Sequence, residues 1–91
     1  MSPGYHYPFA EVTDELKRAV WNKGGTIFCY DSKVWRLDAF GSIIMYSAYG
    51  NIYTDYGWEI DYIIPKAEGG SDSLNNLQPL QWLNNRKKID S

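Results

Sequence analysis

The chain has 91 residues, of which 44% are apolar and 16% aromatic. This length allows one compact domain, and the apolar content is sufficient for a hydrophobic core, so a disordered chain is excluded. The net charge of −2 argues against a broad basic surface for nucleic acid. The single cysteine excludes an internal disulfide, and with one histidine no Cys/His set for a structural zinc site exists.

Sequence features also bear on location and on domain organisation. No apolar run approaches the roughly 20 residues that a membrane span requires, and residues 1–6 lack the basic and apolar segments of a secretory signal. We therefore expect a cytoplasmic protein with no membrane partner. One domain over residues 1–91 is expected, with residues 1–12 loosely ordered because of their prolines and glycine. No oligomerisation signal is evident.

The first predicted element is a helix over about residues 13–22. Thr13 is a suitable N-cap. Leu16, Ala19 and Val20 recur at helical spacing and predict its apolar face. The Lys-Gly-Gly sequence that follows is typical of a helix end.

The middle of the chain gives weaker signals. Residues 26–30 are β-prone but continuous rather than alternating, so their type is ambiguous. Asp31 or Ser32 is a candidate cap for a short helix over residues 33–37. Residues 42–46 predict a strand. Turns are expected at residues 49–51 and 55–57.

The last 34 residues give the clearest succession of elements. Residues 58–64 are rich in β-branched and aromatic side chains and predict a strand that Pro65 ends. A polar loop with a Gly-Gly hinge follows over residues 66–73. A short extended piece is expected at residues 77–80 and a helix over residues 81–88.

Four short motifs in this part of the chain resemble those of the HNH endonuclease family. They are WEIDYIIP at Trp58–Pro65, the pair Gly69-Gly70, NNLQPL at Asn75–Leu80 and NNRKK at Asn84–Lys88. The family pattern is roughly Asp-His-Ile-x-Pro, Gly-Gly, Asn-Leu-Gln-x-Leu and a final Asn or His. The spacing of the motifs and the upstream sequence are similar to a small bacterial or phage type.

This resemblance implies an α+β fold and a set of site residues. The fold would combine an N-terminal helix and a small antiparallel sheet with a C-terminal ββα-metal finger over residues 58–88. Asp61 and Asn85 would hold Mg²⁺ or Mn²⁺ through oxygen atoms, and a degenerate domain would have lost the ion. Asn76 would brace the loop and orient the general base. The expected phosphate contacts to DNA are Arg86, Lys87, Lys88 and Lys66.

One departure from the family pattern dominates the functional interpretation. Tyr62 stands where the family has its catalytic histidine. A tyrosine with a pKa of about 10 is ionised in only about one molecule in a thousand at neutral pH. Loss of a general base costs about 10²–10⁴ in rate. We therefore expect a metal-dependent DNA endonuclease domain that is inactive or strongly impaired.

Several alternatives remain open at this stage. Tyr62 could attack phosphorus itself, His6 could serve as the base, or Tyr62 could be an engineered substitution in an ordinary nuclease. The alternative function is a degenerate HNH domain that binds DNA or a protein partner, as an inhibitor or decoy related to phage. A surplus of tyrosines favours this binding module; the candidate contact residues are Tyr46, Tyr49, Tyr53 and Tyr56.

Several of these residues could also have purely structural roles. Asp61 could be a strand-end acid and Asn85 an exposed helix residue, while residues 86–88 could form a solvated helix end. The tryptophans are expected in the core or at its edge. Cys29 is expected to be a buried, unreactive thiol because its neighbours are apolar.

Overall fold

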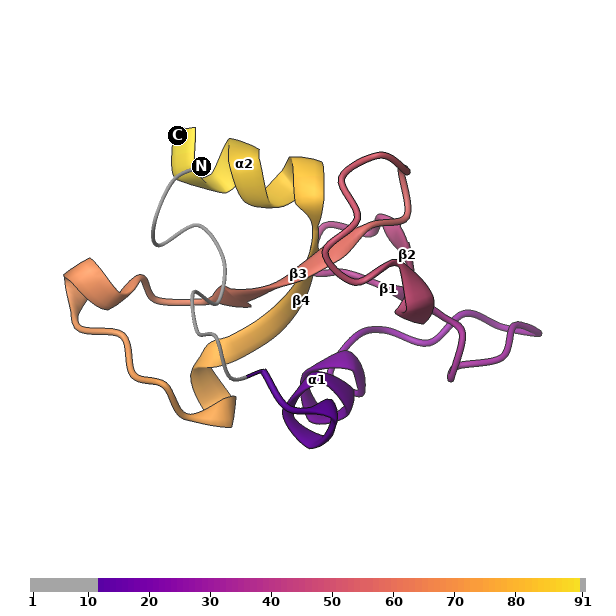
Figure 1. Cartoon of the computed structure of the whole chain (residues 1–91), viewed down its shortest axis with the longest axis horizontal. Coiled ribbons are helices and arrows are strands. Elements are labelled where there is room, and N and C mark those ends of the chain that lie inside the picture. The colour runs from indigo at the N-terminus through magenta and orange to yellow at the C-terminus, as the bar shows by residue number, and fades with distance from the viewer. Residues whose placement is uncertain (1–11, 91) are drawn as a thin grey trace.

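The computed structural model describes residues 12–90, with only the backbone given for residues 89 and 90. The expectations for residues 1–12, Val12 excepted, and for His6 therefore lie outside the described residues. The fold is α+β, as expected (Figure 1). Its helices and strands are α1 (Asp14–Trp21), β1 (Trp35–Leu37), β2 (Ile43–Met45), β3 (Trp58–Tyr62), β4 (Leu77–Gln81) and α2 (Trp82–Asp90). Short 3₁₀ turns lie at Tyr46–Ala48, Lys66–Glu68 and Leu74–Asn76.

The strands form two antiparallel pairs, β1 with β2 and β3 with β4. In the longer pair, Trp58 lies opposite Gln81 and Tyr62 lies opposite Leu77. This β3–β4 ribbon runs through the centre of the molecule between the two helices, and β1–β2 lies at one end (Figure 1). Helix α2 follows β4 directly, which places it against the ribbon. The C-terminal half is thus a strand pair covered by a helix.

The hydrophobic core lies between α1 and one face of β3. Trp58 and Ile60 are fully buried on this face together with Tyr62, because alternate residues of a strand share a face. The rings of Trp21 and Trp58 have centroids 5.2 Å apart. The fully or almost fully buried members of the core cluster are Val20, Trp21, Ile44, Trp58, Ile60, Tyr62 and Leu77. Trp21, which the predicted apolar face of the first helix omitted, is one of the largest of them.

Most predicted elements are confirmed to within two residues at each end. Thr13 caps α1, since its hydroxyl accepts the Leu16 N–H at 3.0 Å. The predicted strands over 42–46 and 58–64 correspond to β2 and β3. The extended piece and the last helix correspond to β4 and α2. No helix within residues 12–90 is long and apolar enough to cross a membrane.

The predicted short helix over residues 33–37 is wrong. The Asp31 carboxylate accepts the Lys33 N–H at 2.9 Å and forms a turn. Residues 35–37 then pair with β2 as a strand. A five-residue helix gains few hydrogen bonds against the cost of its nucleus. Pairing with β2, extended by the bridge between Gly25 and Leu37, satisfies more of the backbone.

The interpretation of Cys29 as a buried thiol is also wrong. Cys29 is exposed and has a φ of 68°, in the left-handed region. Its neighbours Phe28 and Tyr30 are exposed as well. Residues 26–30 find no partner strand within the described chain, and a turn closed by the Tyr30 N–H to the Ile27 carbonyl replaces the ambiguous strand.

A buried carboxylate joins the two strand pairs. Asp38 follows β1, and one of its oxygens accepts the backbone N–H groups of Phe40 and Ser42, each at 2.9 Å. The other oxygen accepts the Gln81 N–H at 2.9 Å and the Asn84 amide at 2.8 Å. These four bonds connect the β1–β2 turn with the junction of β4 and α2. Asp38 therefore fixes where α2 begins relative to the rest of the fold.

We predict that Asp38→Ala lowers the free energy of unfolding by about 3 kcal/mol, because it leaves buried donors without acceptors. Asp31→Ala is the matched control, since Asp31 is exposed and its loss costs roughly 0.5–1.5 kcal/mol. Urea unfolding of both variants measures the difference. Equal destabilisation by the two substitutions would contradict the assigned role of Asp38.

Candidate functional site

The second face of β3 carries two buried carboxylates. Glu59 and Asp61 are only 6% and 1% exposed and lie on the side of the strand that faces α2. Carboxylates are almost never buried in this way unless they are paired. The site is therefore defined by how these two charges are balanced.

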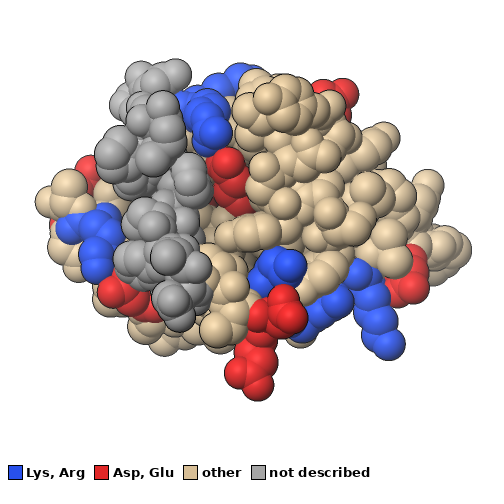
Figure 2. Space-filling model, in the orientation of Figure 1, with Lys and Arg blue, Asp and Glu red and all other residues tan. Residues whose placement is uncertain are grey.

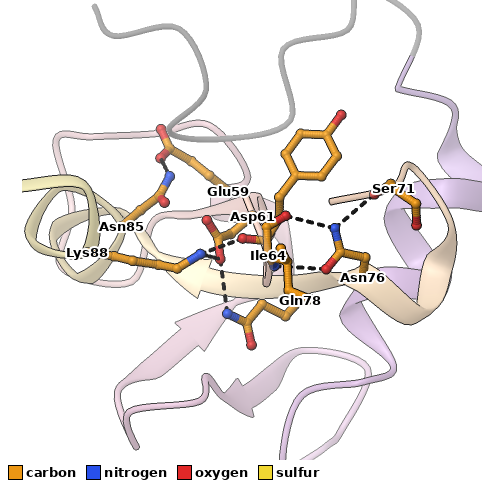
Figure 3. Close-up of polar contacts among 9 residues, drawn as sticks. Glu59, Asp61, Ile64, Ser71, Asn76, Gln78, Asn85 and Lys88 are labelled. Carbon is orange, nitrogen blue, oxygen red and sulfur yellow. Dashed lines mark hydrogen bonds and ion pairs between the residues drawn. The ribbon is translucent and has the colours of Figure 1, made fainter. Parts of the chain in front are cut away.

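Asp61 is paired with a lysine from α2. Its Oδ2 accepts a hydrogen bond from Lys88 Nζ at 2.7 Å and from Gln78 Nε2 at 3.0 Å (Figure 3). Lys88 Nζ also donates to the backbone carbonyl of Tyr62. Burial raises the pKa of the Asp61 carboxyl, while the bonds from Lys88 and Gln78 act in the opposite direction. The ammonium thus lies directly against the carboxylate proposed as a metal ligand.

Glu59 is paired one turn earlier on the same helix. Its Oε1 accepts from Asn85 Nδ2 at 2.7 Å and from Arg86 Nη1 at 2.9 Å, and Arg86 Nη2 reaches Oε2 at 3.4 Å. Asn85 is fully buried, so the interpretation of it as an exposed helix residue is wrong. Its Oδ1 has no hydrogen-bond partner within the described part of the chain. Asn85 therefore contributes an amide donor to Glu59 and one unused acceptor oxygen.

We next ask whether these residues fit a divalent cation. The Asp61 carboxylate and Asn85 Oδ1 are oxygen donors of the kind that Mg²⁺ and Mn²⁺ take. However, the charge of Asp61 is already matched by Lys88 at 2.7 Å. Among residues 12–90, no group of three or more His, Cys, Asp or Glu side chains gathers around a common point. With Lys88 in place, the site fits an ammonium ion and not an additional dication.

Tyr62 is held by the loop that follows β3. The side chain is 1% exposed, and its hydroxyl donates to Asp72 Oδ1 at 2.7 Å. Lys66 Nζ lies 3.0 Å from the other oxygen of Asp72. The hydrogen bond from Tyr62, followed by that from Lys66, lowers the pKa of the Asp72 carboxyl. The Tyr62 hydroxyl is therefore a hydrogen-bond donor in this arrangement.

Asn76 connects both ends of that loop. Its Oδ1 accepts the Ile64 N–H at 2.8 Å, and its Nδ2 donates to the carbonyls of Ile64 and Ser71 at 3.0 and 2.9 Å (Figure 3). Gly69 has a φ of 94°, and a Cβ at Gly70 would lie 1.7 Å from the Ile64 carbonyl oxygen. The Gly-Gly pair and Asn76 together let the loop close tightly upon the end of β3.

The cations assigned to phosphate contact are largely engaged inside the protein. Arg86, Lys88 and Lys66 pair with Glu59, Asp61 and Asp72, respectively. Lys87 is exposed and beside a shallow pocket that Phe40 and Asn84 also line. On the face shown in Figure 2, basic and acidic side chains are interspersed and form no continuous basic patch.

Three residues of this site were missed by the sequence analysis. Glu59 stands two positions before Asp61, and this period-two spacing already placed both carboxylates on one face of a strand. Gln78 lies directly opposite Asp61 on β4, and only the strand register reveals that. No local signal pointed to Asp72 as the partner of Tyr62.

A comparison with protein families agrees with this geometry. A family model described as HNH endonuclease matches residues 49–90. This range contains β3, β4, α2 and all of the site residues described above. The searches of curated proteins and of solved structures returned no match. Residues 49–90 thus match the HNH endonuclease family, and the resemblance seen in the sequence is confirmed.

We predict that Tyr62→Phe raises the pKa of Asp72, because the phenol hydroxyl is the largest cause of its lowering. The bond between them stabilises the fold while Asp72 is ionised, and the variant therefore loses stability less steeply as the pH falls through the native pKa of Asp72. Carboxyl ¹³C shifts followed by NMR measure this pKa. Tyr53→Phe, at an exposed tyrosine, is the control. An unchanged pKa in Tyr62→Phe would contradict the assigned bond.

Proposed function

We propose that this HNH domain is an inactive or strongly impaired DNA endonuclease. The observation that carries the proposal is the hydrogen bond from the buried Tyr62 hydroxyl to the Asp72 carboxylate at 2.7 Å. Hydrolysis of a phosphodiester needs a base that takes a proton from water. At the family's base position, the hydroxyl therefore acts as a hydrogen-bond donor and not as an acceptor for a proton from water.

The partner of the Tyr62 hydroxyl also disfavours its use as a base. A negative oxygen at this position would lie in hydrogen-bond contact with the Asp72 carboxylate, and like charges at that distance repel each other. Lys66 lies 5.8 Å above the Tyr62 ring, but its ammonium already pairs with Asp72. The hydroxyl of Tyr62 is therefore placed as a hydrogen-bond donor and not as the base that the reaction needs. The expected consequence is a rate lower by about 10²–10⁴ than with a competent base.

The same burial argues against Tyr62 as a covalent nucleophile. A tyrosine that attacks phosphorus needs an accessible oxygen and a base that removes its proton. The Tyr62 side chain is 1% exposed, and the group beside its hydroxyl is a carboxylate whose pKa is lowered. A carboxylate with a lowered pKa is a weak base. The observations thus favour loss of catalysis over a change of mechanism.

The remaining family roles are part of the proposal. Asp61 and Asn85 would hold Mg²⁺ or Mn²⁺ in an active relative of this site, where the ion would stabilise charge on the phosphate and the leaving oxygen. Here Asp61 and Asn85 instead pair with Lys88 and Glu59. Lys87, exposed on α2, is the best-placed cation for a DNA phosphate. Arg86, Lys88 and Lys66 would first have to leave their carboxylate partners.

A binding module is the second candidate function, and the exposed aromatic side chains favour it. Tyr53 is 93% exposed and Tyr56 partly so, whereas Tyr46 and Tyr49 pack against the core. Exposed tyrosines are enriched at interaction surfaces. Of the four candidate contact residues, the two that precede β3, Tyr53 and Tyr56, are the most exposed. The partner class, DNA or protein, is for the experiment to decide.

A plasmid-nicking assay with Mg²⁺ or Mn²⁺ tests the proposal. We expect the unmodified protein, with Tyr62, to leave plasmid DNA intact. Because Lys88 lies against Asp61, Tyr62→His is measured alone and combined with Lys88→Met. We expect nicking in the double variant, faster by about 10²–10⁴ than in Lys88→Met alone. Tyr53→His with Lys88→Met is the matched control and should remain silent.

Two other results separate the hypotheses. Robust nicking by the unmodified protein that is abolished by Asp61→Ala would contradict the proposed loss of activity. If the double variant binds Mn²⁺ but does not nick DNA, the domain has lost more than its base. In that case the binding module becomes the better account. Gel-shift assays with DNA would then decide between a DNA and a protein partner.

A further inference from the structure

Counted over residues 12–90, the buried charges between β3 and α2 balance without any added ion. Two buried carboxylates, Glu59 and Asp61, face one guanidinium and one ammonium, those of Arg86 and Lys88. Burying an uncompensated charge is costly, so the observed balance stabilises this interface. A dication added between the strand and the helix would leave two positive charges in excess. The balance therefore opposes metal binding while both cations stay in place.

The position of Lys88 explains how its ammonium reaches the site. Lys88 follows Asn85 by three residues on α2, which puts the two side chains on the same side of the helix. Its Nζ contacts one carboxylate oxygen of Asp61 and the carbonyl oxygen of Tyr62. Carboxylate and carbonyl oxygens are also the ligands of hard metal ions. Figure 3 shows the lysine extended from α2 into this cluster of oxygens.

We propose that the Lys88 ammonium is the resident cation of this site and takes the place of a divalent metal ion. Because Lys88 is part of the chain, it competes with a free ion as an intramolecular partner of Asp61. The folded domain then needs no metal and binds Mg²⁺ or Mn²⁺ weakly. This inference goes beyond the loss of the base at Tyr62, which carries the proposed function, and concerns the metal position.

The chain offers a matched control for Lys88. Lys87 is the adjacent residue of α2 and is exposed, and it forms no ion pair within the described residues. Lys87→Met and Lys88→Met each remove one positive charge and keep an unbranched side chain of similar length. The two variants therefore differ only in position. A general effect of net charge on metal affinity would appear in both variants. An effect of the Asp61 contact would appear only in Lys88→Met.

Calorimetric titration of the full chain with Mn²⁺ tests the proposal. We expect no binding at submillimolar Mn²⁺ for the unmodified protein and for Lys87→Met. Lys88→Met should bind Mn²⁺ more tightly, because the ammonium no longer competes for Asp61. We expect a gain of roughly 10–100-fold, the usual size of the change in metal affinity when a residue beside a metal ligand is replaced. Adding Asp61→Asn to Lys88→Met should abolish that gain. Equal Asp61-dependent binding by the unmodified protein and Lys88→Met would overturn the proposal, as would an absence of binding in a folded Lys88→Met.

A second measurement keeps the proposal testable if Lys88→Met does not fold. The side-chain amide signals of Asn85 in the unmodified protein are followed by NMR during addition of Mn²⁺. Because Asn85 is buried beside Glu59, a paramagnetic ion at Asp61 would broaden these signals. We expect no broadening at submillimolar Mn²⁺. Selective broadening would overturn the proposal, while nicking by Tyr62→His alone would still report on Tyr62.

Discussion

The structure depends on the neutralisation of two carboxylates that β3 buries on one face. Removing such charges from water is expensive, and the cost is offset only by close partners with good hydrogen-bond geometry. Arg86 and Lys88 supply these partners, and both come from α2. These two ion pairs therefore help to set the orientation of α2 on the strand pair. Asp38 fixes the start of the same helix through Gln81 and Asn84.

The opposite face of β3 is apolar and not charged. Trp58, Ile60 and Tyr62 pack there with α1 in the hydrophobic core. Tyr62 serves both this core and the following loop, because its ring is buried while its hydroxyl reaches Asp72. A tyrosine is suited to this double role, since it combines a large apolar ring with a polar tip. Tyr62 thus has a structural function that accounts for its burial.

Local sequence signals predicted the elements well where a helix cap or a run of β-prone residues was clear. Thr13 marked the start of α1, and the β-branched run after Trp58 marked β3. The segment over 33–37 was misinterpreted because its strand partner lies several residues further along the chain. Likewise, motif spacing located Asp61 and Asn85, but their partnerships with Lys88 and Glu59 span 26 or 27 residues. Contacts over such separations follow from strand register and helix placement, which short motifs do not encode.

In the proposed arrangement Lys88, and not a divalent ion, balances the charge of Asp61. Anomalous diffraction at the manganese edge from crystals of the unmodified protein soaked in Mn²⁺ tests it most directly. The account predicts Lys88 Nζ within hydrogen-bond distance of the Asp61 carboxylate and no anomalous peak between Asp61 and Asn85. A manganese peak coordinated by the oxygens of Asp61 and Asn85, with Lys88 turned away, would contradict it.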